Sequence, residues 1–257
     1  MTKEKKQELL DAIVVGGGIA GLTAAYRLRD RNIILLEKDE VPGGRTVSRN
    51  LGPFVYNAGA QVVLGNTSPL AKLVDEIGVK RTLIAKSRIP FYINGKLVSS
   101  TSRLGLLWKM PIPLTDKIKF AWIMLKVGWR YKDLLNKEFD PQDPKVVELN
   151  SNTVSEFIGK VPKSIKDIWE VFAVTGSTMG SDVVTPFHPL MVILFFMEDE
   201  YYVEGGTNQI TITLREKLGD KVRLDAEVSE VKELDDRVQV TYNHRGKREI
   251  LQARQCI

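Results

Sequence analysis

The sequence has few of the residues that build metal centres or disulfide frameworks. Its 257 residues include one cysteine, Cys256, and two histidines, His188 and His244. A single cysteine cannot form an intramolecular disulfide, and these three residues do not assemble a Cys/His metal site. The GxSxG turn of one class of serine hydrolases is also missing. We therefore expect no metal site and no disulfide framework.

Long apolar runs are missing as well. The longest, Leu190 to Met197, has eight residues, whereas a membrane-spanning helix needs about 20. The N-terminal segment MTKEKKQELL is charged and lacks the apolar core of a signal peptide. These features predict a cytoplasmic protein and leave attachment to a membrane surface open. The apolar run is typical of a buried core segment.

The charge of the chain is moderate. Charged residues make up 27% and hydrophobic residues 43% of the composition, as in ordinary globular domains. The formal net charge of +5 is small for this length, so we expect no nucleic-acid partner. The composition predicts one large domain or two modest ones and selects no oligomeric state.

Glycines near the N-terminus have the spacing Gly16-x-Gly18-x-x-Gly21 of a dinucleotide-binding turn. Gly16 allows a tight turn, Gly18 lets the backbone approach a pyrophosphate, and Gly21 lets the next helix pack closely on the strand. The unpaired N–H groups at the start of that helix, around Ile19 and Ala20, favour a phosphate. The alternative is a glycine turn with a purely structural role.

The elements around this turn favour the dinucleotide interpretation. Apolar residues predict buried strands over 11–15 and 33–36, with a helix from about 19 to 29 between them. Such a βαβ unit has parallel strands. Glu37 lies nineteen residues after Gly18, where its carboxylate can accept hydrogen bonds from ribose hydroxyls. It would repel a 2′-phosphate, so NADP is disfavoured.

The residues that follow Glu37 favour FAD over NAD. Gly43 and Gly44 let the backbone pass close to a ligand. Arg45 offers a fixed fork of donors to a phosphate, although a surface salt bridge is the alternative for this side chain. An NAD-dependent enzyme built on the same βαβ unit would leave these three residues unexplained.

The run GGGIAG…LLEKDEVPGGR resembles the FAD-binding N-terminus of the flavin amine oxidase, phytoene desaturase and protoporphyrinogen oxidase superfamily. The resemblance continues in LGPFVYNAGAQ at 51–61, where family members carry a similar glycine segment beside the flavin ring. It returns in YVEGG at 202–206 and in the strand expected over 222–231. It implies that a valine of that strand, best matched by Val228, contacts adenine through its backbone.

The motif and the resemblance together nominate fourteen cofactor-binding residues, and we assign no catalytic acid or base. The fourteen are Gly16, Gly18, Ile19, Ala20, Gly21, Glu37, Lys38, Gly43, Gly44, Arg45, Gly59, Ala60, Gln61 and Val228. The connection over 29–32 lacks the glycine that is usual in the family. The family's second FAD segment, which contacts the flavin end, lies beyond the residues present here. Because the chain stops inside the strand expected over 250–257, and an exposed unfinished apolar strand is a liability, we expect the chain to be a fragment.

The fold implied is α/β: a discontinuous Rossmann-like FAD-binding domain, residues 1–80 and 201–257, with an inserted α+β substrate domain, residues 81–200. The function implied is that of an FAD-dependent oxidoreductase that removes hydride from a C–H bond of a small hydrophobic substrate, by desaturation, porphyrinogen oxidation or amine oxidation. The alternative is a non-catalytic FAD- or nucleotide-binding protein. In the superfamily the region of Leu190 to Met197 can line an apolar substrate cavity.

Residues 104–139 are apolar and basic, and they predict a helix over 116–139. Ile118, Trp122, Leu125 and Trp129 recur on one face, with lysines and Arg130 beside them. One interpretation is a helix lying on an anionic membrane surface. The other, which we favour, is a helix of the substrate domain with a solvated basic side.

Other expectations concern local structure. Asn94-Gly95 predicts a hairpin turn. We expect irregular structure over 41–61, a turn over 201–206 and a helix over 207–218. His188 is expected in a loop or at a helix cap, and His244 in a solvent-facing turn.

Overall fold

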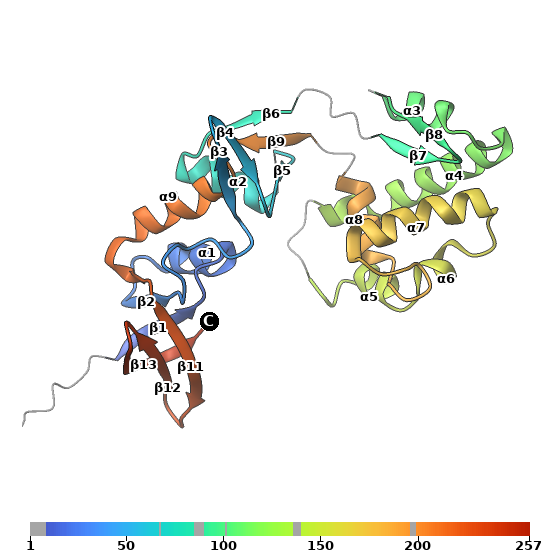
Figure 1. Ribbon diagram of the computed structural model, residues 1–257. Helices are drawn as coiled ribbons and strands as arrows, with labels where there is room; N and C mark the ends of the chain where they lie inside the picture. The colour runs from blue at the N-terminus through green and yellow to red at the C-terminus, as the bar shows by residue number, and fades with distance from the viewer. Residues whose placement is uncertain (1–8, 67, 85–89, 101, 136–139, 196–198) are drawn as a thin grey trace, which may run out of the picture. The chain divides into compact units, whose positions relative to one another are not determined.

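The computed structural model describes residues 9–66, 68–84, 90–100, 102–135, 140–195 and 199–257 (Figure 1). The chain divides into two compact units. The first unit contains Met1–Val63, Leu73–Thr82 and Tyr202–Ile257, and the second contains Leu64–Lys72 and Leu83–Tyr201. Each unit is described by itself below.

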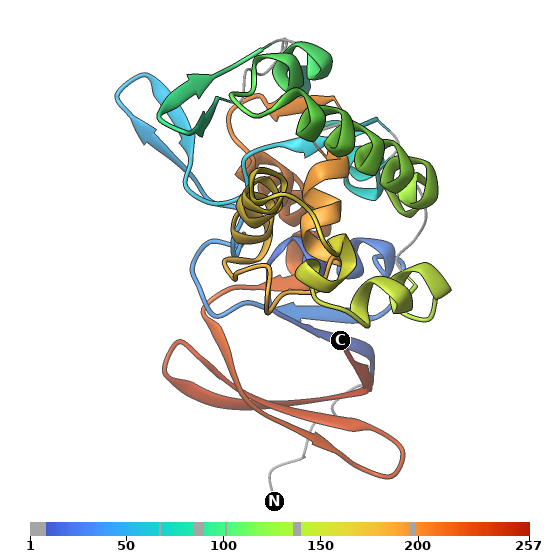
Figure 2. The same ribbon diagram turned by 90° about the vertical axis from the view of Figure 1, so that its right-hand side faces the viewer.

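The first unit is built on a mixed sheet with the strand order β10-β2-β1-β13-β12-β11. Its strands are β1 (Leu10–Val15), β2 (Ile33–Leu36), β10 (Val222–Arg223), β11 (Ala226–Glu233), β12 (Val238–His244) and β13 (Lys247–Cys256). The pairs of β1 with β2, β1 with β13 and β2 with β10 are parallel. The strands β11, β12 and β13 form an antiparallel ribbon, which twists across the lower part of Figure 2. The predicted α/β fold class is confirmed.

The predicted βαβ unit is present, with α1 (Ile19–Arg27) between β1 and β2. All four residues of β2 are buried, as expected for a strand with a neighbour on each side. The helix buries Leu22, Ala25 and Tyr26, whereas Ala20 is exposed. Beside α1 lies α9 (Asn208–Leu218), as Figure 1 shows.

The last strand contradicts one expectation about the sheet. β13 pairs with β1 on one side and with β12 on the other, and the N–H of Ile257 donates to the carbonyl of Ile13. The strand therefore lies between two neighbours, and its pairing with β1 runs from Ala253 to Cys256.

Two segments are more regular than their sequences indicate. The glycine-rich stretch over 41–61 contains a hairpin of β3 (Ser48–Leu51) and β4 (Phe54–Asn57). The stretch over 201–206 begins within β9 (Glu200–Val203) and turns only after it. The prediction of irregular structure over 41–61 was therefore wrong for the hairpin, and the turn predicted over 201–206 is confined to the residues after Val203. β9 also pairs with β5 (Val63–Leu64) and β6 (Arg81–Leu83) in a small sheet.

The second unit is mostly helical. Its helices are α3 (Arg103–Lys109), α4 (Leu114–Tyr131), α5 (Pro144–Asn150), α6 (Val154–Ile158), α7 (Lys163–Ser177) and α8 (Phe187–Phe195), with a 3-10 turn, η1, over Lys132–Leu135. α2 (Pro69–Ile77) spans the boundary between the units. The hairpin of β7 (Phe91–Ile93) and β8 (Lys96–Val98) turns at Asn94-Gly95, as predicted. Both turn residues have positive φ, which explains the Asn-Gly pair.

The core of the second unit surrounds Trp169, which is fully buried on α7 and contacts Phe157 edge to face. In the apolar run of α8, Leu190 and Ile193 are buried. Phe196 and Met197, the end of that run, lie outside the described residues, as do residues 136–139 of the helix predicted over 116–139. None of the helices in the described ranges combines the length and the apolar character needed to cross a bilayer.

The two histidines differ from their predicted positions. His188 is the second residue of α8 and is exposed. His244 ends β12 and is partly buried, with Nδ1 3.5 Å from a carboxylate oxygen of Glu249. The expected turn consists of the next two residues, Arg245 and Gly246, which both have positive φ.

Candidate functional site

The glycine turn after β1 favours glycine at two of its positions, by its backbone conformation at Gly16 and by lack of space at Gly21. The N–H of Gly16 donates to the carbonyl of Leu36 at 2.8 Å, which ties the turn to the end of β2. Gly16 has a φ of +100°, a value that favours glycine. A Cβ at Gly21 would lie 2.0 Å from the carbonyl oxygen of Gly16. The first and third glycines therefore have structural roles in closing the turn.

Gly18 has a different environment. A Cβ there would meet no protein atom within 4 Å, and its φ of −70° suits any residue. It begins α1 without a side-chain cap, and no acidic residue lies in the first turn of that helix. The free N–H groups of a helix N-terminus and the helix dipole attract anions. The space in front of Gly18, Ile19 and Ala20 is therefore suited to a phosphate.

Glu37 connects the turn to the end of β2. Its side chain is buried, and one carboxylate oxygen accepts a hydrogen bond from the N–H of Gly17. The other oxygen accepts from the N–H of Asp39 at 2.9 Å. Carboxylate oxygens have further lone pairs, so Glu37 can still accept a hydrogen bond from a ribose hydroxyl. Lys38 beside it is exposed.

The start of β11 is hydrogen-bonded to the backbone of Glu37. The N–H of Ala226 donates to the carbonyl of Glu37 at 2.8 Å. Val228, two residues further along, is partly buried and faces Tyr242 of β12. The pairing shifts between Val228 and Glu230, which marks a β-bulge. Bulges of this kind redirect a strand locally, and the sequence alone gave no sign of this one.

The segment from Gly43 to Arg45 returns to the glycine turn. Gly43 pairs with Gly18 in an isolated parallel bridge. A Cβ at Gly44 would lie 3.3 Å from the Cα of Gly18, and Gly44 has a φ of +55°. Arg45 is exposed, and its guanidinium pairs with no carboxylate in the part of the chain that the structure describes. The surface salt bridge weighed for Arg45 is absent there.

The glycine segment at 59–61 packs against Arg45. The N–H of Ala60 donates to the carbonyl of Arg45 at 3.1 Å. A Cβ at Gly59 would lie 1.9 Å from that carbonyl oxygen, so only glycine fits. Gly59, Ala60 and Gln61 are exposed. All fourteen nominated residues therefore belong to the first unit, and contacts between backbones connect their segments.

A polar network that the sequence analysis missed holds this segment to the start of α9. Thr207 is buried, and its hydroxyl donates to the carbonyl of Ala60 at 2.8 Å. The side-chain oxygen of Asn57 accepts from the Ser48 hydroxyl at 2.7 Å and from the Thr207 N–H at 3.1 Å. Gly206 is the residue of the sequence that could have indicated this network, because a Cβ there would lie 2.5 Å from the Ser48 hydroxyl oxygen.

Charged groups gather where β10 meets the antiparallel ribbon. Tyr242 is fully buried, accepts a hydrogen bond from Arg223 and donates one to Glu249. Burial raises the pKa of Tyr242 to about 12, and the hydrogen bond to Glu249 acts in the same direction. That hydrogen bond also lowers the pKa of Glu249. Because the carbonyl of Arg223 accepts from the N–H of Glu37 at 2.9 Å, this cluster stabilises the strand beside the candidate site.

The family model for flavin containing amine oxidoreductases matches residues 19–257, which is most of the chain. The chain belongs to the flavin containing amine oxidoreductase family. FAD is the cofactor of this family, whose members are FAD-dependent oxidoreductases. The family resemblance predicted from the glycine motif is confirmed.

Two relatives in this family show how much of a whole protein the chain represents. It is 26% identical to amine oxidase [flavin-containing] A of Canis lupus familiaris, over 92% of the chain and 47% of the relative. It is also 26% identical to amine oxidase [flavin-containing] B of Mus musculus, over 91% of the chain and 48% of that relative. The chain therefore spans about half the length of these relatives.

Solved structures of flavin amine oxidases have the same fold. Wild-type putrescine oxidase bound to putrescine superposes with a TM-score of 0.79 at 20% identity. Cyclohexylamine oxidase from Brevibacterium oxydans superposes with a TM-score of 0.76 at 18% identity. In both cases the match covers 97% of this chain and 57% of the other.

Proposed function

We propose that the first unit binds FAD and that the complete protein uses FAD to oxidise an amine. In this proposal the residues from Asp11 to Arg45, together with Val228, hold the adenosine diphosphate half. The observation that carries the proposal is the hydrogen bond from Gly17 to Glu37 beside the uncapped start of α1. It supports an anionic group and a ribose at adjacent positions, which is the arrangement found in a dinucleotide.

The residues fit a pyrophosphate at the start of α1. The open space at Gly18 is the place that a side chain would fill, and the adjacent N–H groups of Ile19 and Ala20 supply donors. Glu37 would accept hydrogen bonds from the adenosine ribose. Val228 would contact adenine through its backbone, as the resemblance implies.

The segment after Glu37 supports FAD over NAD. Gly44 lies against Gly18, so residues 43–45 border the proposed pyrophosphate position. Arg45 is exposed beside it, with a guanidinium suited to a phosphate. We propose that Gly59, Ala60 and Gln61, tied to the Arg45 backbone, border the flavin half.

Bound FAD supplies a two-electron acceptor for hydride from the substrate carbon next to nitrogen, so that a C–N single bond becomes C=N. The residues of this chain would orient the cofactor and keep water out of the site. The amine class is supported by the names of the similar proteins, which include putrescine oxidase and cyclohexylamine oxidase. We also propose that the amine is hydrophobic, from the apolar run over 190–197 that the resemblance places along the substrate cavity.

The experiment is a flavin spectrum of the complete protein, purified and then mixed anaerobically with amines. Cyclohexylamine and putrescine separate a hydrophobic from a polar substrate. The proposal predicts visible flavin absorbance that bleaches with an amine, and faster with cyclohexylamine. Flavin absorbance that no amine bleaches would instead support the alternative, a non-catalytic FAD-binding protein. A protein that takes up no FAD after reconstitution would contradict the whole proposal.

A further inference from the structure

Helix α4 has two apolar faces, and only one of them is used inside the second unit. Phe120, Val127 and Tyr131 are buried in the core clusters of that unit. Leu114, Ile118, Trp122, Leu125 and Trp129 recur at intervals of four, four, three and four residues, which places them together on the opposite side of the helix. Every residue of this second set is exposed. Proteins rarely expose large contiguous apolar patches unless the patch binds something.

The exposed set includes two tryptophans, and a third lies nearby on α3. Trp122 is 59% exposed, Trp129 is 80% exposed and Trp108 is 71% exposed. A groove of about 450 Å³ between α3 and α4 continues the apolar surface, and its lining includes Trp108, Leu114 and Ile118. Tryptophan is the residue most suited to the boundary between water and the acyl region of a bilayer. We call α3 and the exposed side of α4 the tryptophan face.

The charged residues around the tryptophan face are mostly basic. Residues 103–132 contain seven lysines and arginines and one acidic residue, Asp116. Lys126 lies over the Trp122 ring at 5.2 Å, and Lys117 lies over the Trp108 ring at 5.6 Å. Lys119 flanks the same side as Lys126 and donates to the carbonyl of Lys160 at 3.3 Å. Positive charges therefore border the apolar stripe on both sides.

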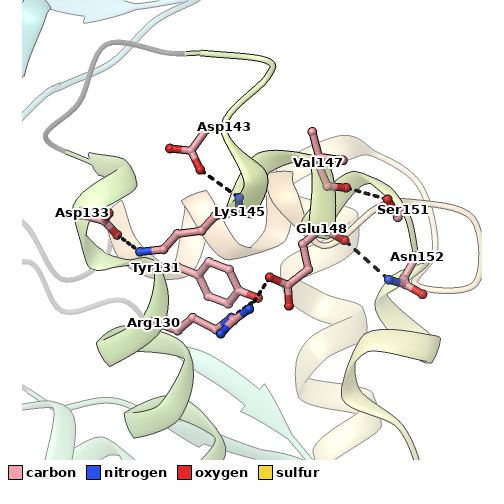
Figure 3. A network of polar contacts seen from close by, with 9 residues as sticks. All are labelled: Arg130, Tyr131, Asp133, Asp143, Lys145, Val147, Glu148, Ser151 and Asn152. Atoms are coloured by element: carbon pink, nitrogen blue, oxygen red, sulfur yellow. Dashed lines mark hydrogen bonds and ion pairs between the residues drawn. The ribbon is translucent and has the colours of Figure 1, made fainter.

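Not every cation near this face is available to a partner. Figure 3 shows the guanidinium of Arg130 on Glu148 of α5, at 2.5 Å, and the ammonium of Lys145 on Asp133, at 2.7 Å. Hydrogen bonding to Glu148 raises the pKa of Arg130. These pairs fasten the end of α4 to α5. Around the tryptophans, lysines 117, 119 and 126 form no ion pair with the described residues, although Lys117 donates to the carbonyl of Trp108 at 2.5 Å.

We propose that the tryptophan face lies on the surface of a membrane containing anionic phospholipid, with the tryptophans at the level of the headgroups. An interfacial helix has an apolar stripe flanked by lysines whose long chains reach back to the phosphates. A protein partner fits this face less well, because the centres of protein interfaces are depleted of lysine. The inference is independent of the proposed amine oxidation.

The test is flotation of the complete, flavin-loaded protein with vesicles of phosphatidylcholine alone or mixed with phosphatidylserine. We expect binding to the mixed vesicles, weakened by salt, and little binding to phosphatidylcholine. Replacing Trp122 and Trp129 by serine should reduce the binding at least tenfold. Replacing Lys119 and Lys126 by glutamine should reduce it by about fivefold for each lysine, since each is worth about 1 kcal/mol at such a surface.

A matched control is available in the β7–β8 hairpin of the same unit. Tyr92 and Leu97 are 75% and 73% exposed, and the strands of their hairpin carry one basic residue, Lys96, so Tyr92→Ser with Leu97→Ser should leave the binding unchanged. Flavin absorbance in each variant confirms that it is folded. Equal binding to both vesicle types, or unchanged binding by the tryptophan variant, would overturn the proposal. So would a tryptophan variant that only turns a dimer into a monomer, because the face would then be a contact between two copies of the chain.

Discussion

Gly17 and Glu37 are twenty residues apart in the sequence, and the N–H of the first donates to the buried carboxylate of the second. A Cβ at position 17 would come within 2.8 Å of the same carboxylate. Glu37 therefore favours glycine at position 17, which the motif itself leaves variable. Glu37, the acidic residue that binds a ribose in proteins with this motif, thus also fixes the glycine turn at which we propose that the pyrophosphate binds.

Glu37→Gln should weaken FAD binding by about 10- to 100-fold, equivalent to about 1.5–3 kcal/mol. Both carboxylate oxygens accept backbone N–H groups, and an amide has only one oxygen to offer. Titration of the apoprotein with FAD measures the change. Glu40→Gln is the matched control, because Glu40 is exposed three residues away. Equal affinities of the two variants would contradict the role of Glu37.

Gly21→Ala should destabilise the apoprotein by about 1–3 kcal/mol, the usual cost of overpacking. The added methyl group would lie 2.0 Å from the carbonyl oxygen of Gly16, which belongs to a hydrogen-bonded turn. Urea unfolding monitored by circular dichroism gives the free energy. Gly128→Ala in α4, where a Cβ meets nothing within 4 Å, should instead be neutral or stabilising by up to about 1 kcal/mol.

Thr207→Val should loosen the segment at 57–61 and cost about 1–3 kcal/mol of stability. The hydroxyl of Thr207 holds the Ala60 carbonyl, and valine leaves that group without its donor. Hydrogen exchange should speed up at the amide of Ala60. Ser229→Ala removes a hydroxyl from an exposed residue of the same unit and should change neither quantity. Unchanged exchange in Thr207→Val would show that the hydroxyl does not hold the segment.

Stability should fall between pH 10 and pH 12 because of Tyr242. The folded state raises the pKa of Tyr242 from 10.0 to about 12, so the stabilisation is complete below pH 10 and is lost as the pH rises through the folded value. The loss should amount to at most about 3 kcal/mol, because one pKa unit is worth about 1.4 kcal/mol. The difference in unfolding free energy between the wild type and Tyr242→Phe, measured at several pH values, isolates it. Tyr92→Phe, at an exposed position, should lose the same stability as the wild type between pH 10 and pH 12. If Tyr242→Phe also loses as much stability as the wild type, Tyr242 is not the cause of the loss.

Much of the first unit could be predicted from local sequence. β2 has the predicted bounds, and α1 ends two residues early, because buried apolar runs and a glycine turn specify these elements directly. The hairpin turn at Asn94-Gly95 could likewise be predicted from its own two residues. In each case the residues that determine the conformation lie within the element itself.

The predictions failed for features that depend on contacts between residues far apart in the sequence. β13 is internal because β1, over 230 positions earlier in the chain, pairs with it, and no local pattern encodes that pairing. The network of Ser48, Asn57 and Thr207 was missed because polar residues in glycine-rich stretches look like loops until their partners are known. On α4 the spacing of Trp122 and Trp129 identified one helix face correctly, but it could not tell that the core uses the opposite face.

The most direct test of FAD binding by this glycine turn is the flavin content of the complete protein carrying Gly18→Ala. A Cβ at Gly18 contacts no protein atom within 4 Å, and the φ of −70° accepts alanine. The thermal stability of the apoprotein should therefore stay at the wild-type value, while FAD affinity falls at least about tenfold because the methyl group occupies the pyrophosphate position. Wild-type FAD affinity in Gly18→Ala would contradict the account.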